Sequence, residues 1–176
     1  SDARGPIRAH LLTLKLGTPG LALDYGSPGA VGRTDQVSDI MARDGAIAGV
    51  NGDFFDIGDT GAPLGIGQDR DLGFLHGPRG GWNSAFFIGR GGRPDIGYVP
   101  LVVSVRNRPT LKITNYNSPS VGPNGIGVYT PEWGPTSGYR VTDGQQQQVR
   151  MVRVVDRRVV ANRGRLNANK PIGGYL

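Results

Sequence analysis

Three aspartates at regular spacing are the residues of this chain best suited to chemistry. Asp53, Asp56 and Asp59 lie in the stretch "GVNGDFFDIGDTG", three positions apart and among glycines. Carboxyl groups placed close together can share general acid, base or nucleophile roles. The spacing differs from that of an EF-hand loop, so a structural calcium ion is a weakly signalled alternative, and the sequence requires no cofactor. Simple hydration of loop aspartates is the competing interpretation.

The residues around Asp53 predict a tight turn. Asn51-Gly52 is the strongest two-residue hairpin signal, and the two phenylalanines after Asp53 would begin the return strand. Asp53 would then lie just past the turn, at a strand end, where it is the best candidate carboxylate. Asn51 and Gly52 would orient it and let a substrate approach the backbone. Asp56 is the second choice, as a partner carboxylate or a ligand of a structural cation.

A helix and a short strand are expected to position this turn. Thr34 can cap a helix over about 34–44, apolar side chains form an i, i+3, i+4 stripe over 37–41, and Gly45 is a natural left-handed stop. The apolar segment 46–50 reads as a short buried strand. The helix and the strand would form a small αβ unit, with Asn51 at the end of the strand.

The remaining sequence predicts short strands and many turns. Strands are expected over 7–16 and 21–25, in hairpins around 84–98 and 101–116, in "GIGVYTPEWG", and in hairpins with turns at 143–144 and 156–157. The glycine-rich stretch 58–81 is long and irregular, which is often a sign of function. The prediction is an α+β, strand-rich mixed-sheet domain spanning 1–176, with one clear helix among nine or ten strands.

Composition limits the kinds of site that the chain can form. The 176 residues include 30 glycines, 13 prolines, no cysteine and two histidines, so disulfides, thiolate sites and multi-histidine metal sites are excluded. The net charge of +6 favours an anionic partner without choosing among nucleic acid, a membrane surface and a phosphorylated polymer. No apolar run approaches the ~20 residues of a transmembrane helix.

The segment "AIAGVNGDFFDIGDTGAPLGI" resembles the signature of phosphodiester glycosidases, the family related to the enzyme that uncovers mannose 6-phosphate by removing N-acetylglucosamine. Three other stretches agree in order and spacing: "GPIRAHLLTLKL", "TDQVSDIMARDGA" and "TNYNSPSVGPNGIGVYTPEWG". The resemblance covers nearly the whole chain. It implies a secreted or cell-envelope hydrolase that cleaves a sugar from a glycosyl phosphodiester or a related envelope glycan.

One departure from the family pattern concerns its second half. Family members continue into a "Leu-Asp-Gly-Gly-Gly-Ser" type segment, which these 176 residues lack. The resemblance therefore implies an incomplete domain, completed by a missing C-terminal half or by a second chain, with cleavage after "GGYL" as the favoured route. That partner would donate part of the active site, including one carboxylate of the catalytic pair.

The resemblance and the residue types together suggest further site residues. Arg70, His76 and Arg79 lie in the irregular stretch and could meet a phosphate. Asn115 and Asn117 could hydrogen-bond sugar hydroxyls.

Trp82 or Trp133 could stack on a sugar ring, although core packing is the commoner role for either tryptophan. No metal ligand is assigned.

Two alternative functions stay open. One is a hydrolase of the same fold that acts on an envelope polysaccharide without phosphate. The other is a non-catalytic module that binds nucleic acid or another polyanion, supported by the charge and by arginine-bearing segments such as "QVRMVRVVDRRVVANR". Nucleic acid is disfavoured, because aromatic residues are not interleaved with the basic ones.

Overall fold

The computed structural model describes residues 3, 5–142, 145, 147–162, 164–165 and 171–172. Within them the chain is strand-rich, and the predicted α+β class is confirmed. The expected turn at 143–144 and the "GGYL" terminus lie outside the described residues.

The main helix, α1 (Val37–Asp44), begins later than the sequence predicts. Gln36 is its N-cap and no side chain caps it, so the proposed role of Thr34 is wrong. The predicted end is confirmed: Gly45 takes a left-handed conformation (φ 64°) and donates its amide to the Met41 carbonyl.

Two shorter helical segments follow later in the chain. They are the single 3-10 turn η1 (Pro131–Trp133) and the four-residue α2 (Gly138–Val141).

Ten strands form five two-stranded sheets in the described residues. Four pairs are antiparallel and the fifth, β7 with β8, is parallel. In chain order the strands are β1 (Gly67–Asp69), β2 (Gly73–His76), β3 (Ser84–Ile88), β4 (Pro94–Tyr98), β5 (Val103–Val105), β6 (Arg108–Ile113), β7 (Asn115–Tyr116), β8 (Gly127–Val128), β9 (Val152–Val155) and β10 (Arg158–Asn162).

The three hairpins expected after residue 80 and within the described residues are confirmed. They are β3–β4, β5–β6 and β9–β10. In the last, Asp156 and Arg157 both take positive φ (48° and 64°), as a two-residue primed turn requires. The sequence does not predict the β1–β2 hairpin, because its strands are short and lie within the glycine-rich stretch.

Three predicted strands are wrong, as is the predicted Asn-Gly hairpin. Residues 7–16, 21–25 and 46–50 are all described, and none joins a ladder. The turn near Asp53 forms instead at 57–60, and 51–53 precede it without regular secondary structure. Apolar alternation alone cannot distinguish these segments from strands, because a strand also needs a paired neighbour.

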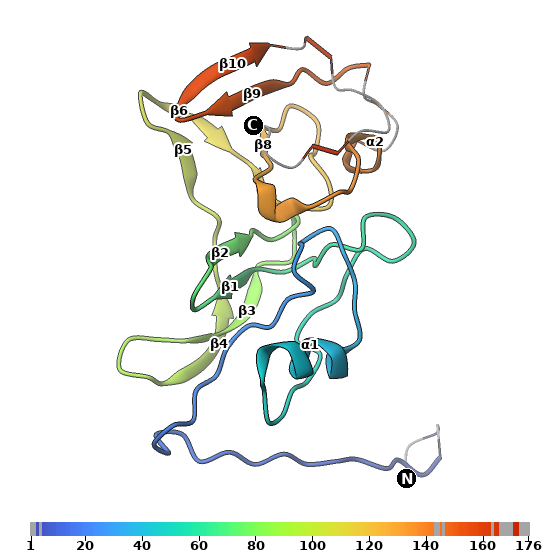
Figure 1. Ribbon diagram of the computed structural model, residues 1–176, viewed down its shortest axis with the longest axis vertical. Helices are drawn as coiled ribbons and strands as arrows, with labels where there is room; N and C mark the ends of the chain where they lie inside the picture. The colour runs from blue at the N-terminus through green and yellow to red at the C-terminus, as the bar shows by residue number, and fades with distance from the viewer. Residues whose placement is uncertain are drawn as a thin grey trace.

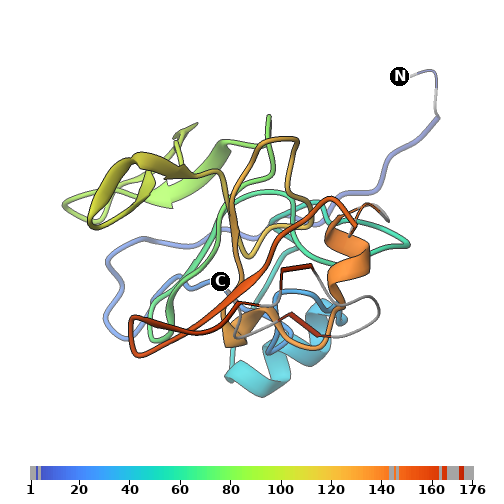
Figure 2. The same cartoon turned by 90° about the horizontal axis from the view of Figure 1, so that it is seen from above.

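The molecule is elongated (Figure 1). The β9–β10 and β5–β6 hairpins lie at one end, whereas α1, the β3–β4 hairpin and the N-terminal segment lie toward the other. Viewed from above, the N-terminal segment extends away from the body (Figure 2). The β1–β2 hairpin lies between the two ends.

A small core holds the centre of the molecule together. Its buried members are Val31, Ala62, Leu75, Tyr129, Trp133, Val141, Met151 and Ile172. Tyr129 and Trp133 meet edge to face, with ring centroids 5.0 Å apart. The core includes Leu75 of β2, so this short strand is fixed between the core and the neighbouring loops.

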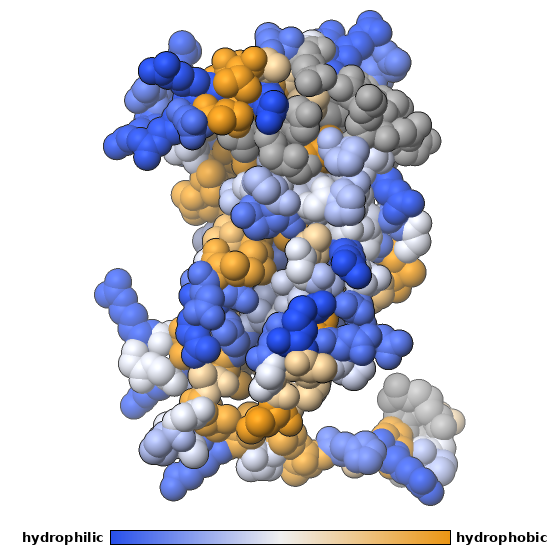
Figure 3. Space-filling model, in the orientation of Figure 1, coloured by the Kyte–Doolittle hydropathy of each residue, from blue (hydrophilic) through white to orange (hydrophobic). Residues whose placement is uncertain are grey.

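Much apolar surface stays uncovered. The accessible surface is 12691 Å², whereas a folded monomer of 18.7 kDa is expected to expose about 8300 Å². Leu11, Ile47, Val50 and Ile57 are each at least 80% exposed. Figure 3 shows apolar surface gathered over the N-terminal segment and the loop that follows α1. The chain as described buries less than a compact domain of its size.

Candidate functional site

Asp53 is half-buried and held by a loop twelve residues further on. The Gly65 amide donates to Asp53 Oδ2 over 2.8 Å. Burial raises the pKa of the Asp53 carboxyl above its ordinary value, and backbone amides of Gly65 and Phe54 partly offset that rise. A carboxyl group that is partly desolvated, yet oriented by a fixed donor, has the character of a catalytic acid or base.

A compact loop sets the position of Asp53. Residues 53–56 run beside 62–65, joined by a bridge between Phe55 and Pro63 and by the Leu64 amide, which donates to the Phe54 carbonyl over 2.9 Å. The chain therefore reverses at 57–60, and Asp53 and Gly65 face each other at the open end of the loop.

The Asp56 side chain bonds within this loop. One of its oxygens, Oδ2, accepts from the Thr60 hydroxyl at 2.7 Å and from the Thr60 amide at 3.1 Å. The Asp56 amide donates to the Ala62 carbonyl, and the Asp56 carbonyl accepts from the Gly61 amide. Asp56 therefore has a structural role in the turn, and its suggested catalytic role stays a prediction.

The partner of Asp59 differs from those of Asp53 and Asp56. Its carboxylate lies 3.8 Å from Arg140 Nε, and Arg140 also donates to the Asp59 carbonyl. The three aspartates thus point to three different partners. The described residues contain no group of three or more acidic or histidine side chains that could hold a metal ion.

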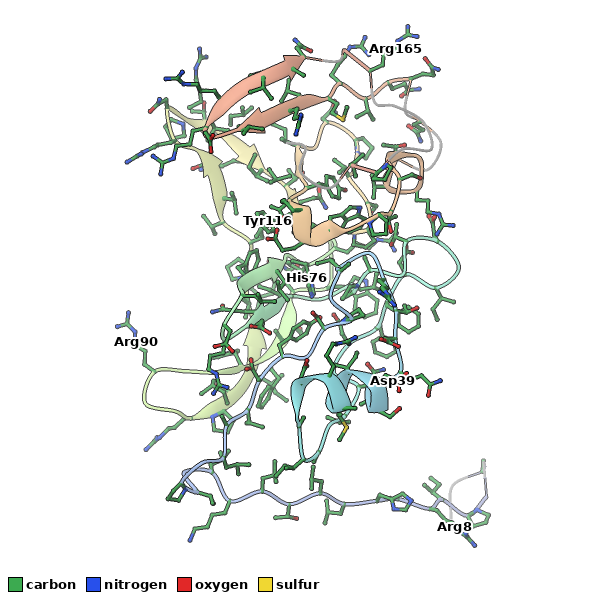
Figure 4. All side chains as sticks on the ribbon, viewed as in Figure 1. Arg8, Asp39, His76, Arg90, Tyr116 and Arg165 are labelled. Carbon is green, nitrogen blue, oxygen red and sulfur yellow. The ribbon has the colours of Figure 1, made fainter. Side chains whose placement is uncertain are left out.

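His76, at the end of β2, contacts Gly65, the same residue that donates to Asp53. Its side chain is 1% exposed. The Tyr25 hydroxyl lies 2.8 Å from Nε2, and the Gly65 carbonyl lies 3.2 Å from Nδ1. Burial lowers the pKa of the His76 imidazole to about 4, so the ring is neutral at pH 7. Figure 4 shows His76 in the middle of the molecule. The ring does not reach solvent, so the predicted direct contact with phosphate has no support here.

Arg79 opens onto a pocket of about 380 Å³. Its amide donates to the Leu64 carbonyl over 2.8 Å. Leu64 precedes Gly65, whose amide donates to Asp53, so Arg79 is attached to the loop that holds Asp53. The other walls of the pocket come from Gly80, Thr114, Asn115, Ser120 and the turn 122–125. Arg79 is the only charged residue in this lining, and it is exposed.

The two candidate asparagines are both buried. Asn115 donates Nδ2 to the Ser120 carbonyl (2.7 Å) and accepts from the Thr114 hydroxyl (2.8 Å), which shapes the pocket wall. Asn117 is fully buried, with φ at 43°.

The Asn117 amide is fully used inside the protein. It donates to the Leu75 carbonyl and to the Thr130 hydroxyl, and it accepts from the Thr130 amide. These contacts give Asn117 a structural role, and no sugar hydroxyl can reach it in this arrangement.

Three other predicted residues lie at the surface. Asn51 and Gly52 are exposed. Arg70 pairs with Asp24: its guanidinium lies 3.4 Å from Oδ2, and its amide donates to Oδ1 over 3.0 Å. Arg70 therefore holds the β1–β2 turn against the segment that carries Tyr25.

The two tryptophans differ. Trp133 is fully buried and donates Nε1 to the Thr136 carbonyl, so it belongs to the core. Trp82 is 39% exposed and packs against Phe54, which is 70% exposed, with ring centroids 5.5 Å apart. Phe54 directly follows Asp53 in the chain, and the Trp82 amide donates to the Arg79 carbonyl.

The structure therefore brings Asp53, His76, Arg79 and Asn115 to the loops around the end of β2, and it leaves Arg70 and Asn51 at the surface. Sequence reasoning misses Tyr25 and Gly65. Neither carries a local signal, because each matters only through a partner that is distant in the chain.

Comparison with known proteins adds no relative: no family model, curated protein or solved structure matches the chain. None of the helices in the described part has the length and apolar character that crossing a bilayer requires.

Proposed function

We propose that this chain is part of a secreted or cell-envelope glycoside hydrolase that releases a sugar from a glycosyl phosphodiester or a related envelope glycan. The single observation that carries the proposal is the convergence of three groups on one loop system. These are the Asp53 carboxyl, which accepts from the Gly65 amide, Arg79, whose backbone amide donates to the Leu64 carbonyl, and the aromatic pair of Phe54 and Trp82. The sequence resemblance to phosphodiester glycosidases points the same way.

Asp53 supplies the carboxyl chemistry in this proposal. A glycosidase carboxyl acts as acid, base or nucleophile at the scissile bond. Because burial raises the pKa of the Asp53 carboxyl, its carboxylate is a better proton acceptor than that of a fully solvated aspartate. A phosphate leaving group is already a weak base, so the demand for proton donation is smaller than for an alcohol.

Arg79 meets the phosphate. Arg79 is exposed and lines a pocket whose other walls carry hydroxyl, amide and glycine groups. A planar guanidinium forms paired hydrogen bonds with phosphate oxygens, which stabilises the charge on both substrate and leaving group.

Phe54, the residue after Asp53, forms a partly exposed aromatic surface with Trp82. Sugar rings present apolar C–H faces, and an aromatic face can cover one of them while the hydroxyls stay hydrated. In this proposal the sugar would lie on the aromatic pair, the phosphate would lie toward Arg79, and the scissile bond would lie near Asp53.

A second chain completes the site in our proposal. Asp56 Oδ2 already accepts two hydrogen bonds from Thr60, which favours a second chain as the source of the other carboxyl. The accessible surface exceeds that of a typical folded monomer of this mass by roughly 4000 Å². Large obligate interfaces bury about 2,000–5,000 Å² counted over both partners, so this excess on one chain is enough to supply its share of such an interface.

Intact mass and a search for a co-purifying polypeptide test the second chain. A single monodisperse species of 18.7 kDa with full activity would contradict it.

The decisive experiment is a screen of sugar 1-phosphodiesters beside matched aryl glycosides, run with any co-purifying chain present. Preferential turnover of the phosphodiesters supports the proposal, whereas equal turnover of aryl glycosides supports a hydrolase of unphosphorylated polysaccharide. Absence of turnover, together with DNA binding that weakens steeply with salt, would favour the polyanion-binding module.

A further inference from the structure

His76 is held in one tautomer by its two neighbours. A carbonyl oxygen can only accept, so His76 Nδ1 carries the proton and donates to the Gly65 carbonyl at 3.2 Å. Nε2 is then unprotonated and accepts from the Tyr25 hydroxyl at 2.8 Å. The ring is neutral because it is buried.

Gly65 joins this imidazole to the candidate carboxylate. Its carbonyl accepts from His76, while its amide donates to Asp53 Oδ2 over 2.8 Å. The hydrogen-bonded chain thus runs from Tyr25 through His76 and the Gly65 backbone to Asp53.

Two glycines make room for this arrangement. A Cβ on Gly65 would lie 2.8 Å from Asp53 Oδ2, and a Cβ on Gly67 would overlap the His76 imidazole. Carboxylate and imidazole therefore pack directly on glycine backbone. A larger residue at either position would displace the group that it meets.

Tyr25 anchors the chain in the core. Its ring packs against the buried cluster and lies 5.6 Å from the His76 ring. Burial, and then the nearby charge of Asp53, raise the pKa of the Tyr25 hydroxyl, so it stays a donor at physiological pH.

We propose that Tyr25 and His76 are positioning residues, which fix the Asp53 carboxylate through the two peptide groups that meet at the Gly65 Cα: His76 bonds to the carbonyl of one, and Asp53 accepts from the amide of the other. The inference rests on the proposed function of Asp53. A displacement of a catalytic group by a fraction of an ångström lowers the rate without abolishing substrate binding. Loss of the Tyr25 hydroxyl should therefore act on turnover more than on KM.

The test compares Tyr25→Phe with Tyr129→Phe in the ¹⁵N-labelled chain, together with its co-purifying chain if one exists. Both substitutions remove a tyrosine hydroxyl that bonds inside the protein, since the Tyr129 hydroxyl donates to the Ser118 carbonyl at 2.9 Å. NMR measures the ¹⁵N shifts of the His76 ring and the exchange rate of the Gly65 amide. Kinetic assays measure kcat and KM for a phosphodiester that the wild-type protein hydrolyses.

We expect wild-type His76 to be the neutral Nδ1–H tautomer. Tyr25→Phe should mix the two tautomers, speed exchange of the Gly65 amide, and lower kcat by about tenfold with KM little changed. Tyr129→Phe should leave the His76 shifts and the Gly65 amide as in wild type.

Several results would overturn the proposal: an Nε2–H tautomer in the wild type, no change in Tyr25→Phe, or equal changes in both variants. If Tyr25→Phe does not fold, the wild-type tautomer decides. The NMR measurements need no turnover, so inactivity on every glycoside would reject the proposed function while the hydrogen-bonded chain is still judged separately.

Discussion

The Gly65 amide and the Asp53 carboxylate lie 2.8 Å apart as donor and acceptor, and this bond links the two arms of the 53–65 loop. Asparagine at position 53 keeps an oxygen that can accept the same bond, but it cannot transfer a proton or attack. Asp53→Asn should therefore remove most glycosidase activity and leave the melting temperature nearly unchanged. Activity assays and thermal unfolding check both parts, and wild-type turnover would refute the role of Asp53.

The Asp56–Thr60 pair should behave as one structural unit. Asp56→Ala should cost about 1–2 kcal/mol of unfolding free energy, because a half-buried carboxylate loses two donors of the turn. Thr60→Ala should cost a similar amount, and the double variant should cost less than the sum. Urea unfolding of all four proteins measures the coupling, and strict additivity would contradict it.

The buried His76 makes stability depend on pH. Its pKa falls from 6.5 to about 4 on folding, so between these values the unfolded chain binds the extra proton. Stability therefore decreases as pH falls through this window, by at most about 3 kcal/mol, and is fully retained above it. Urea unfolding between pH 7 and 4 measures the slope in wild type and His76→Gln. Equal slopes would show that His76 does not cause it.

Arg79 should distinguish phosphorylated from unphosphorylated substrates. Arg79→Ala should raise KM for a glycosyl phosphodiester by about tenfold or more, and leave KM for an aryl glycoside unchanged. Arg90→Ala is the matched control, since it removes the same charge from the β3–β4 turn, where Arg90 points away from the body (Figure 4). Equal losses in the two variants would mean that net charge, rather than the pocket, attracts the substrate.

Local sequence signals predict part of this molecule correctly. They identify the left-handed glycine that ends α1 and the three hairpins after residue 80, because turn chemistry needs only neighbouring residues. The sequence also singles out Asp53, since this aspartate follows an Asn-Gly pair in a glycine-rich stretch. Its role as a catalyst stays a prediction.

Long-range contacts decide the rest. The segments 7–16, 21–25 and 46–50 have apolar patterns that suit strands, yet none joins a ladder, because pairing depends on a neighbour that the pattern does not specify. Asn117 has the residue type of a sugar ligand, but its amide is engaged by the Leu75 carbonyl and by Thr130.

The sequence alone thus determined composition, charge, several turn positions and the candidate carboxylate. Only the tertiary structure decided which groups surround it: Tyr25 and His76 are 51 positions apart in the chain and meet over 2.8 Å. The physical reason is that turns and helix ends arise from local backbone preferences, whereas the environment of a carboxylate depends on burial and on donors brought together by folding.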